Sequence, residues 1–323
     1  MNKKIWFIVS VIIIVVLGIF LANKFLLKGP MAGGPIQNTD TSSITRKWTN
    51  IAYANKSEAQ KLDIYLPETG EGPFPVIISI HGGAFKMGDK ADGQLVPMLE
   101  GVKRGYAVVG VNYRLSDEAI FPAQINDLKA AIKFIKANAK EYKLNPNKIA
   151  VWGGSAGGNL SSLVGTSGGV KDLADDSLGN SVQSDNVQAV VDWYGPIYFS
   201  TMDSEFTSLG QTPAMGSTNN TKSPETAYIG KTIGTDEAEE LVKKASPQTY
   251  ISSTTPPFYI QHGTADRNIP ITQSINFSEK LKAGIGDDKV IFEKIEGAGH
   301  GGSHFESSEN LEKIFTFLDK YLK

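Results

Sequence analysis

The feature that most constrains the fold is an alternation of short apolar runs with segments of helical periodicity. The runs are "PVIISI", "YAVVGVNY", "KIAVWG", "VQAVVDWYG" and "PFYIQHG". Continuous apolar runs of this length are typical of strands covered on both faces. Between them, segments such as "AQINDLKAAIKFIKANAKEY" repeat apolar residues at helical spacing. The alternation predicts an α/β fold with a mostly parallel sheet and helices on both faces.

The whole pattern predicts about eight strands. "WTNIAY" and "KLDIYLP" alternate like half-buried strands and predict an antiparallel hairpin at the sheet edge, and "KVIFEKIEG" supplies the last strand. Helices are predicted at residues 93–104, 123–142, 156 to about 164, 274–284 and 308–322. Residues 203–244 have no clear period. They predict either an insertion over the C-terminal edge of the sheet, which would be the candidate lid, or a surface loop.

Composition excludes several classes of function. The net charge of −2 over 323 residues gives no sign of a nucleic-acid-binding surface. The chain has no cysteine, which excludes disulfides, cysteine nucleophiles and thiolate metal sites. The sequence says nothing about the oligomeric state. Since α/β folds often run to about 250 residues as one unit, residues 45–323 are predicted to form a single domain.

The N-terminal residues are predicted to lie outside the folded domain. Residues 5–22, "IWFIVSVIIIVVLGIFLA", carry no charge and follow two lysines. At about 1.5 Å per residue such a helix nearly spans a ~30 Å hydrocarbon core. Residues 1–28 are therefore predicted to be a retained membrane anchor, with a cleaved signal peptide as the alternative. Residues 29–44, rich in Gly, Pro, Ser and Thr, predict a flexible stalk. Either interpretation of the N-terminus places the domain outside the cytoplasm.

One serine stands among four glycines in "VWGGSAGGN", between a predicted strand and a predicted helix. A sharp strand-to-helix turn forces unusual backbone angles on Ser155, and side chains at positions 153 and 157 would collide. The helix that follows presents its positive end to a developing anion. The alternatives are a glycine-rich turn and a phosphate loop. A Walker-type loop requires a lysine near the helix start, and none is present, so Ser155 is the candidate nucleophile.

A reactive serine needs backbone donors for the oxyanion. "SIHGGAF" follows a predicted core strand, and its two glycines let backbone N–H groups approach a substrate oxygen. We expect the amides of Gly83, Ala84 and Ala156 to be these donors. His81 precedes the glycines and is expected to buttress the loop. The alternative is a tight turn in which His81 is only structural.

The serine also needs a base and a group that orients the base. "EGAGHGGSHF" lies between the last strand and the last helix, and there His300 is flanked by two glycines. His304, closer to the helix, is the rival. In "QHGTADRNIP" the only acid is Asp266, which follows a strand, whereas Asp287 and Asp288 precede one. Because ligands bind at the carboxyl edge of open α/β sheets, we predict Asp266 as the orienting acid and His300 as the base.

The spacing of the histidines does not predict a metal site. His300 and His304 are close in sequence, but no further histidine or carboxylate has ligand spacing. His262, at a strand end, is expected to be packed. No cofactor is expected. Phe85, Trp193 and Tyr194 follow strand ends near the motifs and are expected to line the acyl pocket, with core packing as the alternative explanation.

At this point the sequence resembles the α/β-hydrolase superfamily over residues 45–322. The segments that carry the resemblance are "HGGAF", "VNYRLS", "FPAQINDLKAAI", "GGSAGG", "GTADRNIP" and "GAGHGG". Their order, and the chain order Ser155, Asp266, His300, are those of this superfamily. Within it, the chain looks like feruloyl/acetylxylan esterase-like carboxylesterases of the H-G-G branch, near hormone-sensitive-lipase-type esterases. The third glycine of that branch's loop is Ala84 here, which keeps the amide.

The resemblance implies a serine esterase that acts on short acyl esters, with acetyl or feruloyl groups on carbohydrate as candidates, and without a cofactor. It also implies backbone donors from the second and third residues after His81. Two other functions are compatible with the fold. A serine peptidase related to prolyl oligopeptidases would carry a large propeller, and no repeat of about 40–50 residues occurs here. A non-catalytic surface-binding protein would not need Ser155, Asp266 and His300 together.

Overall fold

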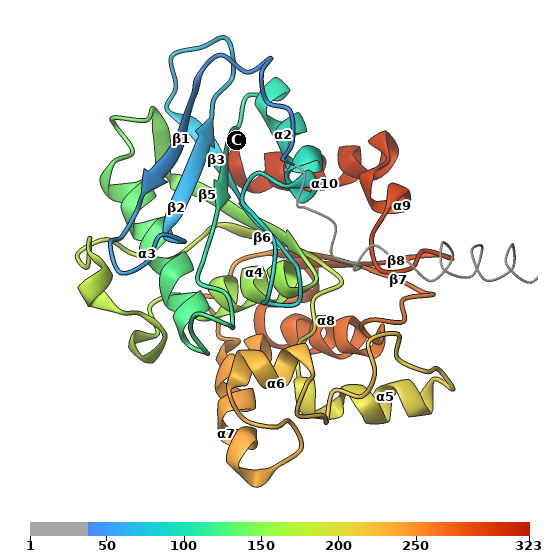
Figure 1. Ribbon diagram of the computed structural model, residues 1–323. Helices are drawn as coiled ribbons and strands as arrows, with labels where there is room; N and C mark the ends of the chain where they lie inside the picture. The colour runs from blue at the N-terminus through green and yellow to red at the C-terminus, as the bar shows by residue number, and fades with distance from the viewer. Residues whose placement is uncertain (1–37) are drawn as a thin grey trace, which may run out of the picture. The chain divides into compact units, whose positions relative to one another are not determined.

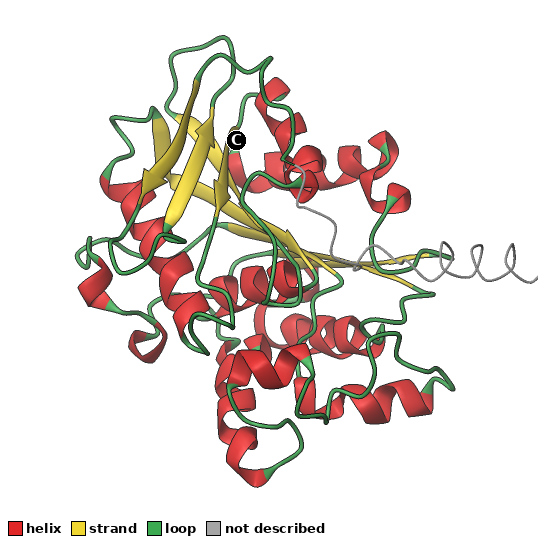
Figure 2. Cartoon of the chain, in the orientation of Figure 1, coloured by secondary structure: helices red, strands yellow, loops and turns green. Residues whose placement is uncertain are grey.

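The computed structural model of this protein describes residues 38–323 (Figures 1 and 2). The predicted membrane anchor and most of the predicted stalk lie outside these residues. Within the described range, no helix combines the length and the apolar character needed to cross a bilayer.

An eight-stranded sheet organises the described residues, in the order β1-β2-β4-β3-β5-β6-β7-β8. The strands are β1 (Lys47–Ala52), β2 (Lys61–Tyr65), β3 (Phe74–Ile80), β4 (Ala107–Val111), β5 (Leu144–Gly154), β6 (Ala189–Trp193), β7 (Phe258–Gly263) and β8 (Val290–Ile295). The pairs β1–β2 and β2–β4 are antiparallel, and all others are parallel. The predicted α/β-hydrolase fold, with its edge hairpin and parallel centre, is confirmed.

Helices cover both faces of this sheet, as Figure 1 shows. They include α2 (Val96–Lys103), α3 (Ala123–Ala137), α4 (Ala156–Thr166), α8 (Thr272–Ile285) and α10 (Ser308–Leu322). Residues of α3, α4 and α8 belong to one hydrophobic cluster, and residues of α2 and α10 to the other. The central strands are buried on both faces, which explains why their sequences read as continuous apolar runs.

One predicted helix is too long. Residues 123–142 carry helical periodicity, but α3 ends at Ala137. The side chain of Asn138 donates to the carbonyl of Phe134 (2.8 Å), and a turn with positive φ at Lys143 leads into β5. Ala139 and Tyr142 are buried in that turn. Because these two apolar residues continue the helical spacing, the sequence pattern extends beyond Ala137, where the helix ends.

The segment 203–244, predicted without clear periodicity, contains short helices separated by loops. It belongs to an insertion between β6 and β7 that carries α5 (Met202–Ser208), α6 (Pro224–Ile229) and α7 (Asp236–Ala245). In α7 only Ala238, Val242 and Ala245 are buried. These few small apolar residues give too weak a helical signal to detect in the sequence. The insertion is bound to the body of the domain, because the Ala214 amide donates to the carbonyl of Arg267 (2.7 Å).

The start of the domain also differs from the prediction. Residues 38–44 belong to the predicted flexible stalk, yet Asn38 forms an antiparallel bridge with Asp92. The Thr39 amide donates to the carbonyl of Ala91 (2.7 Å), and its hydroxyl donates to the carbonyl of Asp92 (2.8 Å). The predicted boundary at residue 45 was therefore too late, because polar residues that bond to a loop leave no apolar pattern.

Candidate active site

Ser155 occupies a strained turn between β5 and α4. Its backbone angles are φ 58° and ψ −124°, a region that costs a non-glycine residue of order 1–3 kcal/mol. Two hydrogen bonds hold this conformation. The Ser155 amide donates to the carbonyl of Trp193 (2.9 Å), and the Ser155 carbonyl accepts from the amide of Asn159 (3.0 Å). The strain turns the serine side chain out of the sheet edge, where it is partly exposed.

The structure shows why positions 153 and 157 must be glycine: as the sequence predicted, a side chain at either position would collide with the backbone. A Cβ added to Gly153 would lie 2.4 Å from the carbonyl oxygen of Gly157. A Cβ added to Gly157 would lie 2.1 Å from the carbonyl oxygen of Ile80. Both distances are far below van der Waals contact. The turn can form only if both positions lack a side chain.

The structure brings Ser155, His300 and Asp266 into one hydrogen-bonded chain. His300 Nε2 lies 2.9 Å from Ser155 Oγ, and His300 Nδ1 lies 2.7 Å from Asp266 Oδ2. The acid follows β7 and the histidine follows β8. Because a carboxylate can only accept, Nδ1 carries the ring proton and Nε2 remains free to accept the serine proton. The arrangement has the geometry of a nucleophile, a base and an orienting acid.

The surroundings of Asp266 keep its carboxyl group ionised. The side chain is 2% exposed, and this burial by itself raises its pKa. Hydrogen bonds from His262 and His300 outweigh the burial, so the pKa of Asp266 lies below its usual range. The other carboxyl oxygen accepts from the amides of Asn268 (2.8 Å) and Ile269 (3.1 Å). An ionised Asp266 can therefore stabilise a protonated His300.

His262 is packed, as the sequence predicted, but it also lies beside the orienting acid. The ring is fully buried, with Nδ1 2.7 Å from the hydroxyl of Ser274 and Nε2 3.0 Å from the carbonyl of Ile269. Its Nε2 is also 3.3 Å from Asp266 Oδ2. The sequence contains no signal for this contact beyond the four-residue spacing between His262, at the end of β7, and Asp266, in the loop that follows.

The rival residues lie elsewhere. His304 is exposed in α9 (Ser303–Glu306), and Asp287 and Asp288 precede β8 at the opposite end of that strand. Among residues 38–323, no three histidine, aspartate or glutamate side chains are grouped so that they could hold a metal ion.

The loop after β3 lies against the serine. A Cβ added to Gly82 would be 3.3 Å from Ser155 Cβ. Three successive residues have positive φ: Gly83 (106°), Ala84 (57°) and Phe85 (60°). Within the described part of the chain, the amides of Gly83, Ala84 and Ala156 form no hydrogen bond to backbone or side-chain acceptors. They are free donors beside the serine, which is what an oxyanion hole requires.

His81 buttresses this loop. Its buried ring stacks on Tyr113, with ring centroids 4.4 Å apart, and the Tyr113 hydroxyl donates to the His81 carbonyl (2.9 Å). His81 Nδ1 is 2.9 Å from the carbonyl of Gly82, and the Gly82 amide donates to Gln94 Oε1 (2.8 Å). Burial lowers the pKa of His81, so the ring is neutral at pH 7.

The family model described as BD-FAE matches residues 62–281, more than half of the chain. The chain belongs to the BD-FAE family. The match includes the nucleophile turn and the acid loop, and it ends before His300.

The relatives are esterases. A truncated carbohydrate esterase from gut microbiota is 33% identical, with a TM-score of 0.75, covering 88% of this chain and 99% of that one. A bifunctional GH43-CE protein of Bacteroides eggerthii is 37% identical, also with a TM-score of 0.75, over 85% of this chain and 35% of its own. The probable carboxylic ester hydrolase LipM of Mycobacterium tuberculosis is 29% identical over 86% of this chain and 63% of its own. The chain spans about three fifths of the length of the curated relatives it matches.

Two of the three residues expected to line the acyl pocket do not do so. Trp193 is 3% exposed and packs against Trp152 and Phe305 on the α10 side of the sheet, where its indole N–H donates to Gln261 Oε1 (2.8 Å). Phe85 is 1% exposed, within the opposite hydrophobic cluster. Both predictions were wrong, because core packing accounts for these side chains.

Tyr194 does lie at the site. Its ring centroid is 4.6 Å from that of His300. A Cβ added to Gly154 or to Gly301 would lie 2.9 Å from the Tyr194 hydroxyl. The ring therefore stands between the serine turn and the histidine loop. Burial is the main reason why its pKa is raised well above the usual value, so the hydroxyl stays protonated as a donor.

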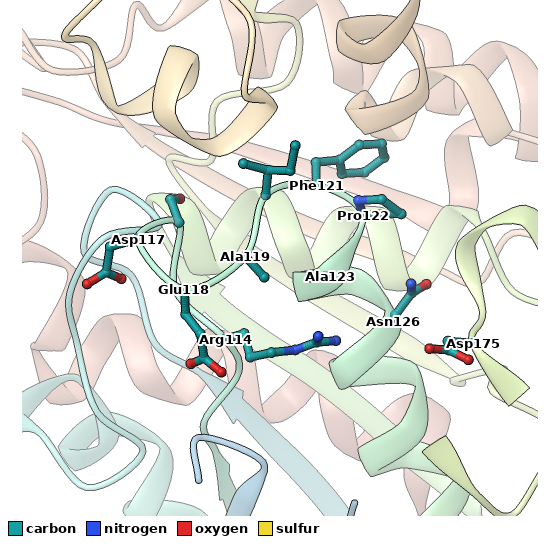
Figure 3. A pocket seen from close by; sticks show the side chains of 11 residues that line it. Arg114, Asp117, Glu118, Ala119, Phe121, Pro122, Ala123, Asn126 and Asp175 are labelled. Atoms are coloured by element: carbon teal, nitrogen blue, oxygen red, sulfur yellow. The ribbon is translucent and has the colours of Figure 1, made fainter. Parts of the chain in front are cut away.

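A hollow of about 610 Å³ lies beside the loop that joins β4 to α3 (Figure 3). Neither Ser155 nor His300 lines it. Its lining residues are Arg114, Ser116, Asp117, Glu118, Ala119, Ile120, Phe121, Pro122, Ala123, Asn126 and Asp175. The same loop reaches the strained segment next to the serine, because the amide and hydroxyl of Ser116 donate to the carbonyl of Phe85 (2.8 and 2.9 Å).

Proposed function

We propose that this protein is a serine carboxylesterase that forms an acyl-enzyme on Ser155. The observation that carries the proposal is the pair of hydrogen bonds that His300 makes: Nε2 accepts from Ser155 Oγ (2.9 Å), and Nδ1 donates to Asp266 Oδ2 (2.7 Å). The membership of the BD-FAE family and the esterase relatives support the same reaction class.

The proposed reaction follows from the geometry. His300 Nε2 accepts the proton of Ser155, whose oxygen attacks the ester carbonyl. The free amides of Gly83, Ala84 and Ala156 stabilise the tetrahedral oxyanion. His300 then gives its proton to the departing alcohol, and water hydrolyses the acyl-enzyme by the same proton transfers in a second cycle.

We propose short acyl groups, with acetyl or feruloyl esters of carbohydrates as the candidate natural substrates. The carbohydrate esterase that is 33% identical over nearly its whole length supports this class. Purified full-length protein would be assayed on p-nitrophenyl acetate, butyrate and octanoate, on acetylated xylan, and on a feruloyl ester. The proposal predicts the highest kcat/KM on acetate or butyrate. A preference for octanoate would contradict the short-chain assignment.

The mechanism is tested by Ser155→Ala beside Ser161→Ala. Ser161 lies in α4, the helix that follows Ser155, and its buried hydroxyl has no hydrogen-bond partner in the described residues, so its loss removes no hydrogen bond. Ser155→Ala should abolish hydrolysis, and Ser161→Ala should keep the parent rate. Equal rates for Ser155→Ala and the parent would rule out the serine mechanism. Faster cleavage of prolyl-peptide anilides than of any ester would favour the peptidase alternative, and no hydrolysis of either would favour a binding protein.

We also propose that residues 5–22 anchor the protein, with the domain outside the cytoplasm. The support is the uncharged apolar run that follows two lysines. Because the chain has no cysteine, Val182→Cys at a position that is 92% exposed would introduce the only thiol. On intact cells this thiol should react with a membrane-impermeant maleimide, and the protein should sediment with membranes. Labelling only after lysis would refute the location, and release into the medium would indicate a cleaved signal peptide.

A further inference from the structure

An aromatic cluster joins the insertion to the loop that carries the free amides. The rings of Phe85 and Tyr228 are stacked face to face, with centroids 4.0 Å apart and planes 7° apart. Tyr228 comes from α6 of the insertion, and its ring is fully buried. Phe199 lies edge-on to both rings, 6.1 Å from Phe85 and 6.0 Å from Tyr228. Phe121 lies edge-on to Tyr228 only (5.7 Å).

The loop after β3 needs such support because its conformation is strained. Ala84 and Phe85 both have positive φ, which side chains disfavour. The first half of the loop is bonded to Tyr113 and Gln94, and the carbonyl of Phe85 is held by Ser116. The amides of the middle of the loop are left without acceptors. The carbonyl of Gly83, in the same peptide unit as the Ala84 amide, accepts from the amides of Lys86 (3.0 Å) and Met87 (3.1 Å), but these bonds lie within the loop itself. The side chain of Phe85 ties this turn to the insertion, because the face of Tyr228 covers it.

Tyr228 is itself fixed to the body of the domain. Its carbonyl accepts from the amide of Phe121 (2.8 Å), which belongs to the loop around the hollow of Figure 3. That loop also holds the Phe85 carbonyl through Ser116. The ring of Tyr228 thus contacts the side chain of Phe85, and the loop around the hollow binds its carbonyl. A displacement of α6 would change the position of Phe85 and, through one peptide unit, that of the Ala84 amide.

We propose that Tyr228 is a positioning residue for the oxyanion hole: its ring, stacked on Phe85, holds the amides of Gly83 and Ala84 where the oxyanion forms. This inference rests on the proposed esterase function. It assigns the insertion a part in catalysis that does not depend on its covering the site. The hydroxyl of Tyr228 has no hydrogen-bond partner among residues 38–323, so the ring, and not the hydroxyl, makes the contact with the loop.

The test compares Tyr228→Leu, Tyr228→Phe and Phe121→Leu in the full-length protein. Tyr228→Leu removes the stacked ring and should lower kcat on p-nitrophenyl acetate about ten- to hundredfold, below the 10²–10³ of a wholly lost donor. KM should change less than twofold, because both rings are buried away from the surface that a substrate can reach. Tyr228→Phe keeps the ring and should restore the parent kcat. Phe121→Leu loses an edge contact in the same cluster but keeps the backbone amide that binds the Tyr228 carbonyl, and among the described residues its ring makes no ring contact with Phe85. This variant should keep kcat near the parent value.

A second readout reports the oxyanion hole directly. Phenylboronic acid forms a tetrahedral adduct with an active serine, so its inhibition constant should rise in Tyr228→Leu by about the same factor by which kcat falls. Thermal unfolding of Tyr228→Leu and Phe121→Leu controls for loss of the fold. Equal kcat and equal boronate affinity in these two variants would overturn the inference, as would a Tyr228→Phe variant as slow as Tyr228→Leu. A parent protein that hydrolyses no ester would instead overturn the proposed function.

Discussion

The substitution Asp266→Asn tests the hydrogen-bond chain in one step, because the structure dictates how the new amide must turn. One oxygen of Asp266 accepts from two backbone N–H groups, those of Asn268 and Ile269. The amide carbonyl of the replacement must keep that position, since an NH₂ group there would face two donors. The NH₂ group would then point at His300 Nδ1, 2.7 Å away in the parent.

This orientation inverts the histidine tautomer. Nδ1 would have to accept, so the ring proton would move to Nε2 and point at Ser155 Oγ. The serine would then have no base. In serine hydrolases with such a wrong tautomer, kcat falls about 10⁴-fold, or about 5.5 kcal/mol at 1.36 kcal/mol per tenfold change. We expect a loss of this size on p-nitrophenyl acetate at pH 7, with KM nearly unchanged.

The matched control is Asp203→Asn. Asp203 also accepts from two backbone amides, one on each oxygen, those of Thr218 (2.7 Å) and Asn219 (3.0 Å). It lies in the insertion, and none of its hydrogen bonds involves Ser155, His300 or Asp266. It should lose stability and keep kcat. The reasoning is refuted if Asp266→Asn retains more than a tenth of the parent kcat while both variants unfold at similar temperatures.

Two stability predictions follow from buried charges. Burial raises the pKa of Glu225 from 4.5 to about 7, so its contribution to stability is full below about pH 4.5 and declines as pH rises to about 7, by up to about 3 kcal/mol. The free energy of unfolding, measured in urea, should differ less between pH 5 and pH 8 for Glu225→Gln than for the exposed control Glu240→Gln. The same pH difference in both variants would contradict the prediction. Arg114→Met breaks the pair with the fully buried Asp127 (2.7 Å) and should cost about 3–5 kcal/mol. Arg104→Met, at a surface pair of the same length, should cost less than about 1 kcal/mol, and equal losses would refute the distinction.

Much of the fold was predictable because it depends on local and periodic properties of the sequence. Strands buried on both faces require continuous apolar residues, and α10 was predicted to the residue because its apolar face repeats at helical spacing. The hydrogen-bonded chain was predictable for a related reason. Its three members lie where parallel strands end, at Ser155 after β5, Asp266 after β7 and His300 after β8, so a parallel sheet brings them to one edge.

The sequence by itself thus determined the sheet, the strained turn at Ser155 and the residues that meet at the sheet edge. Only the tertiary structure decided which side chains face the site. Trp193 and Tyr194 are neighbours, yet Trp193 packs among Trp152 and Phe305 while Tyr194, with φ 45°, lies against His300. Likewise, no pattern in the sequence connects Phe85 with Tyr228, which are far apart along the chain. Periodicity reports which face of an element is buried. It does not report which distant ring fills that face, because packing partners are selected by shape in three dimensions.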